Sequence, residues 1–130
     1  VTDGKWAPVN AVDMSSKADA DIYVLGDASH QGDMPKSGFS ANSQAKVCAN
    51  AVRGALTGST VFPAKFSNTC WSLIATNDGV KVGATYEATA EKIAKVDGFV
   101  SKTGETADVR QATYEESEGW YSGITSDMFG

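Results

Sequence analysis

The sequence predicts an α+β fold, in which a strand-loop-helix unit is followed by a small antiparallel sheet with a C-terminal helix. Three observations support this prediction. Ile22–Leu25 is a short run of apolar and β-favouring residues that precedes a helical pattern. Two strand-like stretches flank the turn sequence Thr76–Gly79, which is typical of a β-hairpin. The last segment, from about Asp108 to Thr125, is compatible with a helix.

The length and composition limit the chain to one domain, or to one domain and a small appendage. It has 130 residues, of which 42% are hydrophobic, and a net charge of -5. The acidic balance argues against nucleic acid as a partner, because no basic stripe is present to replace counterions on phosphates. It suits a basic protein partner. No apolar run approaches the roughly 20 residues that span a bilayer, so we expect no membrane span.

The N-terminal residues predict a short extended segment. Trp6–Val12 is largely apolar but contains Pro8, and a polar turn follows at Ser15-Ser16-Lys17. No signal peptide is visible. Because the chain begins at Val1 without a methionine, we expect a processed product or a piece of a longer protein.

Asp27 follows the first predicted strand and is a candidate ligand contact. Four consecutive residues, Ile22–Leu25, are typical of a strand that is covered on both faces, and Gly26-Asp27 ends it. Open α/β folds place ligand-binding groups at the carboxyl ends of such strands. The Asp27 carboxylate could accept hydrogen bonds from ribose or ribityl hydroxyls, or it could cap the following turn.

The next predicted element is a helix from about Ser40 to Leu56, which Gly54 and Gly58 end. Its predicted buried face consists of small or apolar residues at spacings of four, three, four and three: Ala41, Ala45, Cys48, Val52 and Ala55.

The start of this helix, Ser37–Ala41, is a second candidate for ligand contact. Ser37, Gly38 and Ser40 are small or capping residues, and the first amides of a helix have no intrahelical partner. They could face an anionic or carbonyl group of a ligand, or form an ordinary N-cap. Lys36, just before them, could compensate negative charge on a bound ring or could simply be solvated.

The second half of the chain predicts three strands. Thr69–Ala75 and Val80–Tyr86 form the hairpin, after a connector at Thr60–Phe66 that contains Pro63. A third strand is expected from Lys92 to Val96 and beyond, with Ile93 and Phe99 as its apolar contacts.

The cysteines and the histidine limit the chemistry of the chain. Cys48 and Cys70 do not form a CxxC pair, and His30 is the only histidine, so we expect no metal site. Cys48 is most simply a small buried residue of the helix. Cys70 is either structurally buried or redox-active, and a redox role requires a partner thiol. The two could also form a disulfide with each other. No serine-histidine-acid spacing supports hydrolysis.

Four stretches together resemble a known family. They are Ile22–Ala28, the run from Met34 through Pro-Lys-Ser-Gly-Phe-Ser-Ala-Asn-Ser-Gln to Lys46, Ser67–Leu73 with its Asn-Thr-Cys sequence, and the terminal Asp127–Gly130. The chain is similar to the C-terminal third of the flavoprotein subunit of flavocytochrome c sulfide dehydrogenase, a member of the FAD-dependent pyridine nucleotide-disulfide oxidoreductase superfamily. The resemblance covers nearly the whole chain and is least clear over residues 87–113.

The resemblance implies a periplasmic enzyme that passes electrons from sulfide to FAD and on to a c-type cytochrome subunit, which alone carries heme. Cys70 corresponds to one cysteine of the redox-active disulfide, and Trp120 to an aromatic residue near the flavin and the cytochrome-facing side, which makes it an electron-transfer candidate. Asp27 corresponds to the acid that holds the ribityl chain, and Ser37–Ala41 to the helix start at the pyrimidine edge. The implied cofactor-binding residues are Gly26, Asp27, Lys36, Ser37, Gly38, Ser40 and Ala41.

The sequence also departs from the family pattern. The glycine-rich dinucleotide motif and the first redox cysteine of the family lie upstream and are not present here. We therefore expect residues 1–62 to form the C-terminal part of the FAD-binding domain, and residues 63–130 a C-terminal interface domain that docks the cytochrome. Such a chain is not expected to be active alone. The alternatives are a relative of sulfide:quinone reductase and a non-catalytic acidic cytochrome-binding module.

Overall fold

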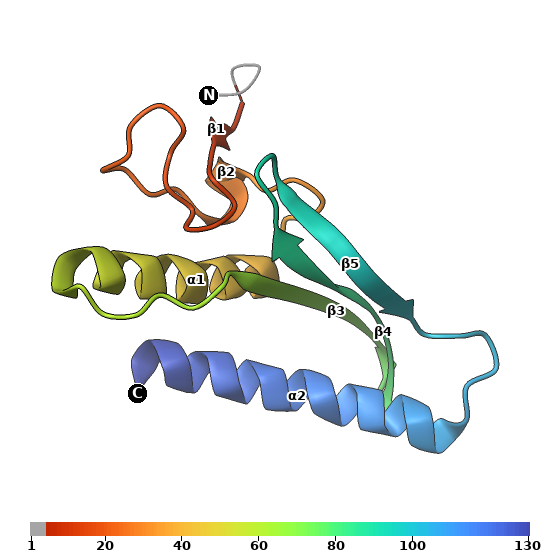
Figure 1. Ribbon diagram of the computed structural model, residues 1–130. Helices are drawn as coiled ribbons and strands as arrows, with labels where there is room; N and C mark the ends of the chain where they lie inside the picture. The colour runs from red at the N-terminus through yellow and green to blue at the C-terminus, as the bar shows by residue number, and fades with distance from the viewer. Residues whose placement is uncertain (1–4) are drawn as a thin grey trace. The chain divides into compact units, whose positions relative to one another are not determined.

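The structure is a computed structural model that describes residues 5–130 (Figure 1). The chain divides into two compact units: the first comprises the chain up to Asn68 together with Ala84–Asp97, and the second comprises Thr69–Gly83 together with Gly98–Gly130. The elements in chain order are β1 (Ala7–Pro8), the 3-10 helix η1 (Gly26–Ala28), β2 (Ser29–His30), α1 (Gly38–Thr57), β3 (Lys65–Ala75), β4 (Asp78–Ala88), β5 (Ile93–Val100) and α2 (Ala107–Phe129).

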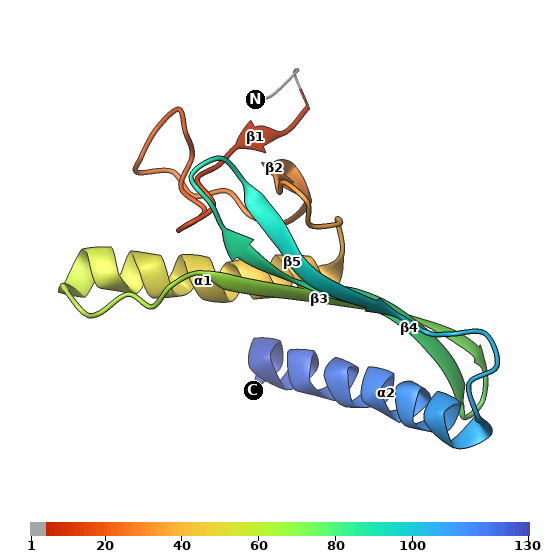
Figure 2. The same ribbon diagram turned by 45° about the vertical axis from the view of Figure 1, so that its right-hand side comes forward.

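The three-stranded antiparallel sheet and the C-terminal helix confirm the predicted α+β fold class. The strands follow the order β3-β4-β5 and run side by side in both views (Figures 1 and 2). β3 and β4 form the predicted hairpin and are longer than expected. Asn77, in the turn between β3 and β4, has a φ of 59°, a left-handed conformation that asparagine tolerates better than most residues. β5 confirms the third strand, in which Ile93 is buried and Phe99 is exposed.

The predicted strand at Ile22–Leu25 is wrong. Ile22 is 52% exposed, and Tyr23 forms only an isolated bridge to Ser15. The backbone hydrogen bonds of this run go to the segment just before it, since Ser16 N–H donates to Ile22 O at 2.7 Å and Val24 N–H donates to Met14 O at 3.0 Å. The backbone groups of the run that make these bonds are not available to a sheet ladder.

The strand of the strand-loop-helix unit lies after Gly26 instead of before it. β2 pairs in parallel with β1, with Ala7 opposite Ser29 and Pro8 opposite His30. The two-residue β1 is all that the predicted extended segment at Trp6–Val12 contributes to this ladder. Pro8 is acceptable there because such a short edge ladder needs few backbone donors.

Helix α1 confirms the predicted helix, but it begins two residues earlier and ends one residue later than predicted, and Gly54 lies inside it. Ser37 is the N-cap, and Gly58 ends the helix in a left-handed conformation with a φ of 68°. The buried face is shifted from the predicted one, because Ala41, Ala45 and Val52 are only half-buried and Ala55 is exposed. The residues that the helix buries are Ser40, Gln44, Cys48, Ala51 and Gly54.

The core of the first unit gathers residues from distant parts of the sequence. Met14 is fully buried, and Phe66 and Ile93 are nearly so; they pack with Val9, Ala11, Met34, Cys48, Ala84 and Tyr86. Gly32, with a φ of 63°, lies against the backbone of Ile93. Beside it, the Lys92 ammonium donates to Asp33 at 2.6 Å and lowers the pKa of that carboxyl, and the backbone N–H of Lys95 adds to the effect.

The second unit consists of the far end of the hairpin, the end of β5, and α2. α2 confirms the predicted C-terminal helix and extends it at both ends. Gly79 lies against the backbone of Tyr114, where an added Cβ would be 3.1 Å from the Tyr114 nitrogen. The rings of Trp71 and Trp120 have centroids 5.7 Å apart. Among residues 5–130, no helix combines the length and the hydrophobicity needed to cross a membrane.

Candidate functional site

The Gly26-Asp27 turn is fixed against helix α1. Gly26 has a φ of 68°, and an added Cβ would lie 3.4 Å from the Cβ of Ala41. Its N–H donates to Gln44 Oε1 at 2.7 Å, and its carbonyl accepts from Ser29 Oγ and Gln31 Nε2, both at 2.9 Å. Glycine is therefore favoured here by the left-handed backbone conformation, whereas the distance to Ala41 would allow an ordinary contact.

Two buried amide side chains complete this arrangement. Gln44 is fully buried, and its Nε2 donates to Gln31 Oε1 at 2.7 Å. Since Gln31 in turn donates to Gly26, the three residues form a closed ring of hydrogen bonds, in which each bond restrains the others. Asp27 follows directly and is exposed. The ring of hydrogen bonds therefore fixes the backbone next to Asp27, whose side chain is exposed to solvent.

Lys36 holds the same turn from the other side. Its Nζ donates to the carbonyl of Asp27 at 2.6 Å and to the carbonyl of Ser29 at 3.0 Å. The ammonium also lies 4.7 Å from the ring centroid of Trp6, a cation-π contact. Lys36 is therefore held by the protein and is not a freely solvated lysine, and it places a positive charge beside Asp27.

The start of α1 is an N-cap whose hydroxyl groups point into the protein. Ser37 Oγ accepts from Ser40 N–H at 3.0 Å and donates to Asn68 Oδ1 at 2.5 Å. Ser40 Oγ also donates to Asn68 Oδ1, at 3.1 Å. With both hydroxyls engaged, the exposed part of the helix start is the backbone at Gly38. The N-cap is observed, and its role toward a ligand stays a prediction.

The seven predicted cofactor-binding residues all lie in the first unit, on η1 and on the first turn of α1 with the lysine before it. Cys70 and Trp120 lie in the second unit.

Cys70 stands on β3 and is half-buried. It lines a cavity of about 440 Å³ in the second unit, together with three basic side chains, Lys81, Lys102 and Arg110. Lys81 Nζ also pairs with Glu116 at 2.6 Å, and Arg110 pairs with Asp78. The next residue, Trp71, contacts Trp120 of α2. Cys70 is thus placed beside a cavity with a cationic lining, where an anion can approach it.

Cys48 and Cys70 are not joined to each other in this structure, so the alternative of a Cys48–Cys70 disulfide is not observed. Cys48 lies in the core of the first unit, as predicted for a small buried residue. Burial raises the pKa of its thiol, and the negative charge of Asp13 adds to the effect. A buried thiol that is kept protonated is poorly suited to redox chemistry.

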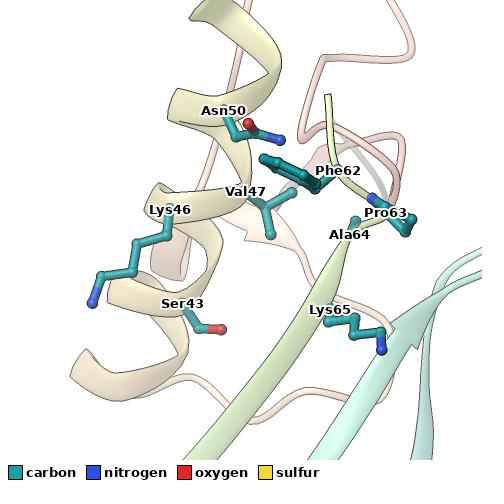
Figure 3. Close-up of a pocket in the computed structure, with 8 residues that line it drawn as sticks. All are labelled: Ser43, Lys46, Val47, Asn50, Phe62, Pro63, Ala64 and Lys65. Atoms are coloured by element: carbon teal, nitrogen blue, oxygen red, sulfur yellow. The ribbon is translucent and has the colours of Figure 1, made fainter. Parts of the chain in front are cut away.

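A second cavity lies between α1 and the segment that follows it (Figure 3). It has a volume of about 360 Å³ and is lined by Ser43, Lys46, Val47, Asn50, Phe62, Pro63, Ala64 and Lys65. The segment can fold back along α1 because Gly54 has no side chain where Val61 packs. None of the predicted site residues lines this cavity.

Three residues that hold the candidate site were not predicted. Gln31, Gln44 and Asn68 are all buried and all carry hydrogen bonds between segments. Asn68 belongs to the Asn-Thr-Cys sequence, which carries the resemblance but gives no hint of its partners. Gln44 lies between Ser40 and Cys48 on the helix, and a polar residue at that spacing could have drawn attention to a buried polar network.

Comparison with known protein families matches residues 63–129 to the flavin-binding family of flavocytochrome c sulphide dehydrogenase. The match covers just over half of the chain and includes Cys70 and Trp120, whereas the candidates between Gly26 and Ala41 precede it. These flavoproteins bind FAD, belong to an oxidoreductase and act with a cytochrome partner. The chain therefore belongs to the flavocytochrome c sulphide dehydrogenase flavin-binding family.

Proposed function

We propose that this chain is the flavin-covering and cytochrome-docking part of a periplasmic sulfide dehydrogenase, with Cys70 as one half of a redox-active disulfide. The observation that carries the proposal is the family match across β3 and α2, which contains Cys70. The partner cysteine and most of the FAD site would come from outside this chain.

The residues of the candidate site fit FAD in their chemistry. Asp27 offers an exposed carboxylate to the hydroxyls of a ribityl chain, and Lys36 holds the carbonyl of the same residue. The exposed backbone at Gly38, at the positive end of the α1 dipole, would face the pyrimidine edge of the ring. When bound, FAD supplies the two-electron acceptor for the thiolate that forms during sulfide oxidation.

Cys70 carries the sulfur chemistry in this proposal. HS⁻ attacks one sulfur of the disulfide, a new S–S bond joins it to that cysteine, and the other cysteine leaves as a thiolate. The cationic lining of the cavity beside Cys70 attracts the anionic substrate. Lys102, Lys81 and Arg110 therefore act on the approach of HS⁻ and not on bond formation itself.

The cytochrome would dock on the acidic side of α2. Its exposed acids are Asp108, Glu115, Glu116, Glu118 and Asp127, which complement a basic partner. Trp120 on the same helix, in contact with Trp71 next to Cys70, is the candidate for electron transfer toward that partner.

The test uses the complete enzyme purified from its source organism. We expect flavin absorbance that sulfide bleaches, no bleaching in Cys70→Ser, and normal bleaching in the control Cys48→Ala. A colourless complete protein would indicate a non-catalytic cytochrome-binding module. Unchanged sulfide-dependent reduction in Cys70→Ser would remove the cysteine from the mechanism. Reduction of a quinone but not of a c-type cytochrome would favour the sulfide:quinone reductase relative.

A further inference from the structure

We infer that Asn68 is a positioning residue that fixes the start of helix α1 for the cofactor, an inference that rests on the proposed function. Asn68 lies on β3 and is 3% exposed, and its Oδ1 is the acceptor for two hydroxyl groups of the helix start. No step of the proposed sulfur chemistry involves this residue.

The two hydroxyl bonds determine how the helix begins. The Ser37 hydroxyl donates a hydrogen bond to Asn68 Oδ1 at 2.5 Å. This bond turns the oxygen lone pairs of Ser37 toward the Ser40 N–H, from which Ser37 Oγ accepts a hydrogen bond at 3.0 Å. Ser40 is fully buried and gives its own proton to the same Asn68 oxygen. One amide oxygen thus fixes both serines, and with them the direction in which the first amides of α1 point.

Asn68 also ties the helix start to the strand that carries Cys70. The residue before it, Ser67, donates its N–H to Ser43 Oγ on α1 at 3.1 Å, one turn beyond Ser40. Three hydrogen bonds, two to Asn68 and one from Ser67, therefore hold the beginning of α1 to β3 within the first unit. Cys70 follows Asn68 by two residues along β3, so the sequence Asn-Thr-Cys joins a positioning group for the cofactor to the proposed redox cysteine.

Two substitutions of Asn68 separate its effect on the position of the helix start from its effect on folding. Asn68→Ala removes the acceptor of both hydroxyls. Asn68→Asp keeps the oxygen acceptor of both hydroxyls, loses the NH2 donor of the amide, and adds a negative charge near the N-terminus of α1, which is favourable for the helix itself. That charge would oppose the negative charge that a flavin ring gains on reduction beside the same helix end.

The experiment measures FAD affinity and the flavin reduction potential in the complete holoenzyme. We expect Asn68→Ala to weaken FAD binding about tenfold, which corresponds to about 1.4 kcal/mol of binding free energy. We expect Asn68→Asp, which keeps the acceptor of both hydroxyls, to shift the flavin potential to a more negative value. The matched control is Asn50→Asp, the same change on α1 more than three turns from its start, and it should leave both quantities unchanged.

The possible outcomes separate this inference from the proposed function. Wild-type FAD affinity in Asn68→Ala, or a wild-type potential in Asn68→Asp, would overturn the positioning role while the flavoprotein function stands. A shift of equal size in Asn50→Asp would overturn it as well, because the effect would then be one of net charge. If Asn68→Ala does not fold, the potential of Asn68→Asp decides. A complete wild-type protein without flavin would overturn the proposed function and the inference together.

Discussion

Replacing Gln44 with leucine should destabilise the first unit strongly, although the two side chains are similar in size. Gln44 is fully buried, and its amide bonds to Gly26 N–H and Gln31 Oε1, each at 2.7 Å. In Gln44→Leu both partners stay buried and lose their bonds. An unsatisfied buried polar group costs about 1–3 kcal/mol, so two cost about 2–6 kcal/mol, and the added apolar contact offsets about 1–2 kcal/mol of this. We expect a net loss of about 3 kcal/mol.

Urea denaturation, with the free energy of unfolding extrapolated to water, measures this loss directly. The matched control is Gln111→Leu on α2, where the exposed amide donates to Glu115 at 2.9 Å. This variant should change the free energy of unfolding by less than about 0.5 kcal/mol. Similar values for the two variants, or a loss below about 1 kcal/mol in Gln44→Leu, would refute the reasoning that the ring of amides holds the Gly26-Asp27 turn.

Two further predictions concern the same unit. Gly32→Ala should lower the free energy of unfolding by about 2–3 kcal/mol, because Gly32 has a φ of 63° and an added Cβ would lie 2.5 Å from the carbonyl oxygen of Ile93. The control is Gly104→Ala, which has open space around the added Cβ and should lower the free energy of unfolding by only about 1 kcal/mol. Equal losses in the two variants would contradict the steric argument. The raised pKa of Cys48 means that above its ordinary value of 9.0 the unfolded chain loses the thiol proton first, so stability falls as pH rises toward the folded pKa. Urea denaturation at about pH 8 and about pH 10 should show a smaller pH-dependent loss in Cys48→Ala than in the wild type, and equal losses would contradict this assignment.

The elements with strong local patterns were predictable, and those that depend on distant partners were not. The hairpin is encoded by a turn sequence between two strand-like stretches, and α1 by its cap residues and its terminal glycine, all within short windows. The run at Ile22–Leu25 has the composition of a buried strand, but its hydrogen bonds go to residues 14–16, which composition does not reveal. The buried face of α1 differs from the predicted one for a similar reason, because apolar spacing does not mark buried polar residues such as Ser40 and Gln44.

The same distinction applies to the candidate site. The residues expected to meet a ligand, such as Asp27 and Ser37, stand next to glycines and helix starts and can be found from the sequence. The groups that hold them come from far along the chain: Asn68 is 31 residues from Ser37, and Gln44 is 18 residues from Gly26. Single-sequence patterns carry no information about such pairs, because a buried asparagine or glutamine has no characteristic neighbours.

Helix α1 has a polar and an apolar half on its buried face, and the division agrees with the proposed site. Its first two turns bury Ser40 and Gln44, whose hydrogen bonds hold β3 and the Gly26-Asp27 turn. Its later turns bury Cys48, Ala51 and Gly54, which pack without directional bonds. Apolar packing tolerates small shifts, whereas a satisfied polar network specifies one arrangement. The fold therefore places its most directional contacts at the end of α1 where Asp27 and the helix start would have to meet one ligand together.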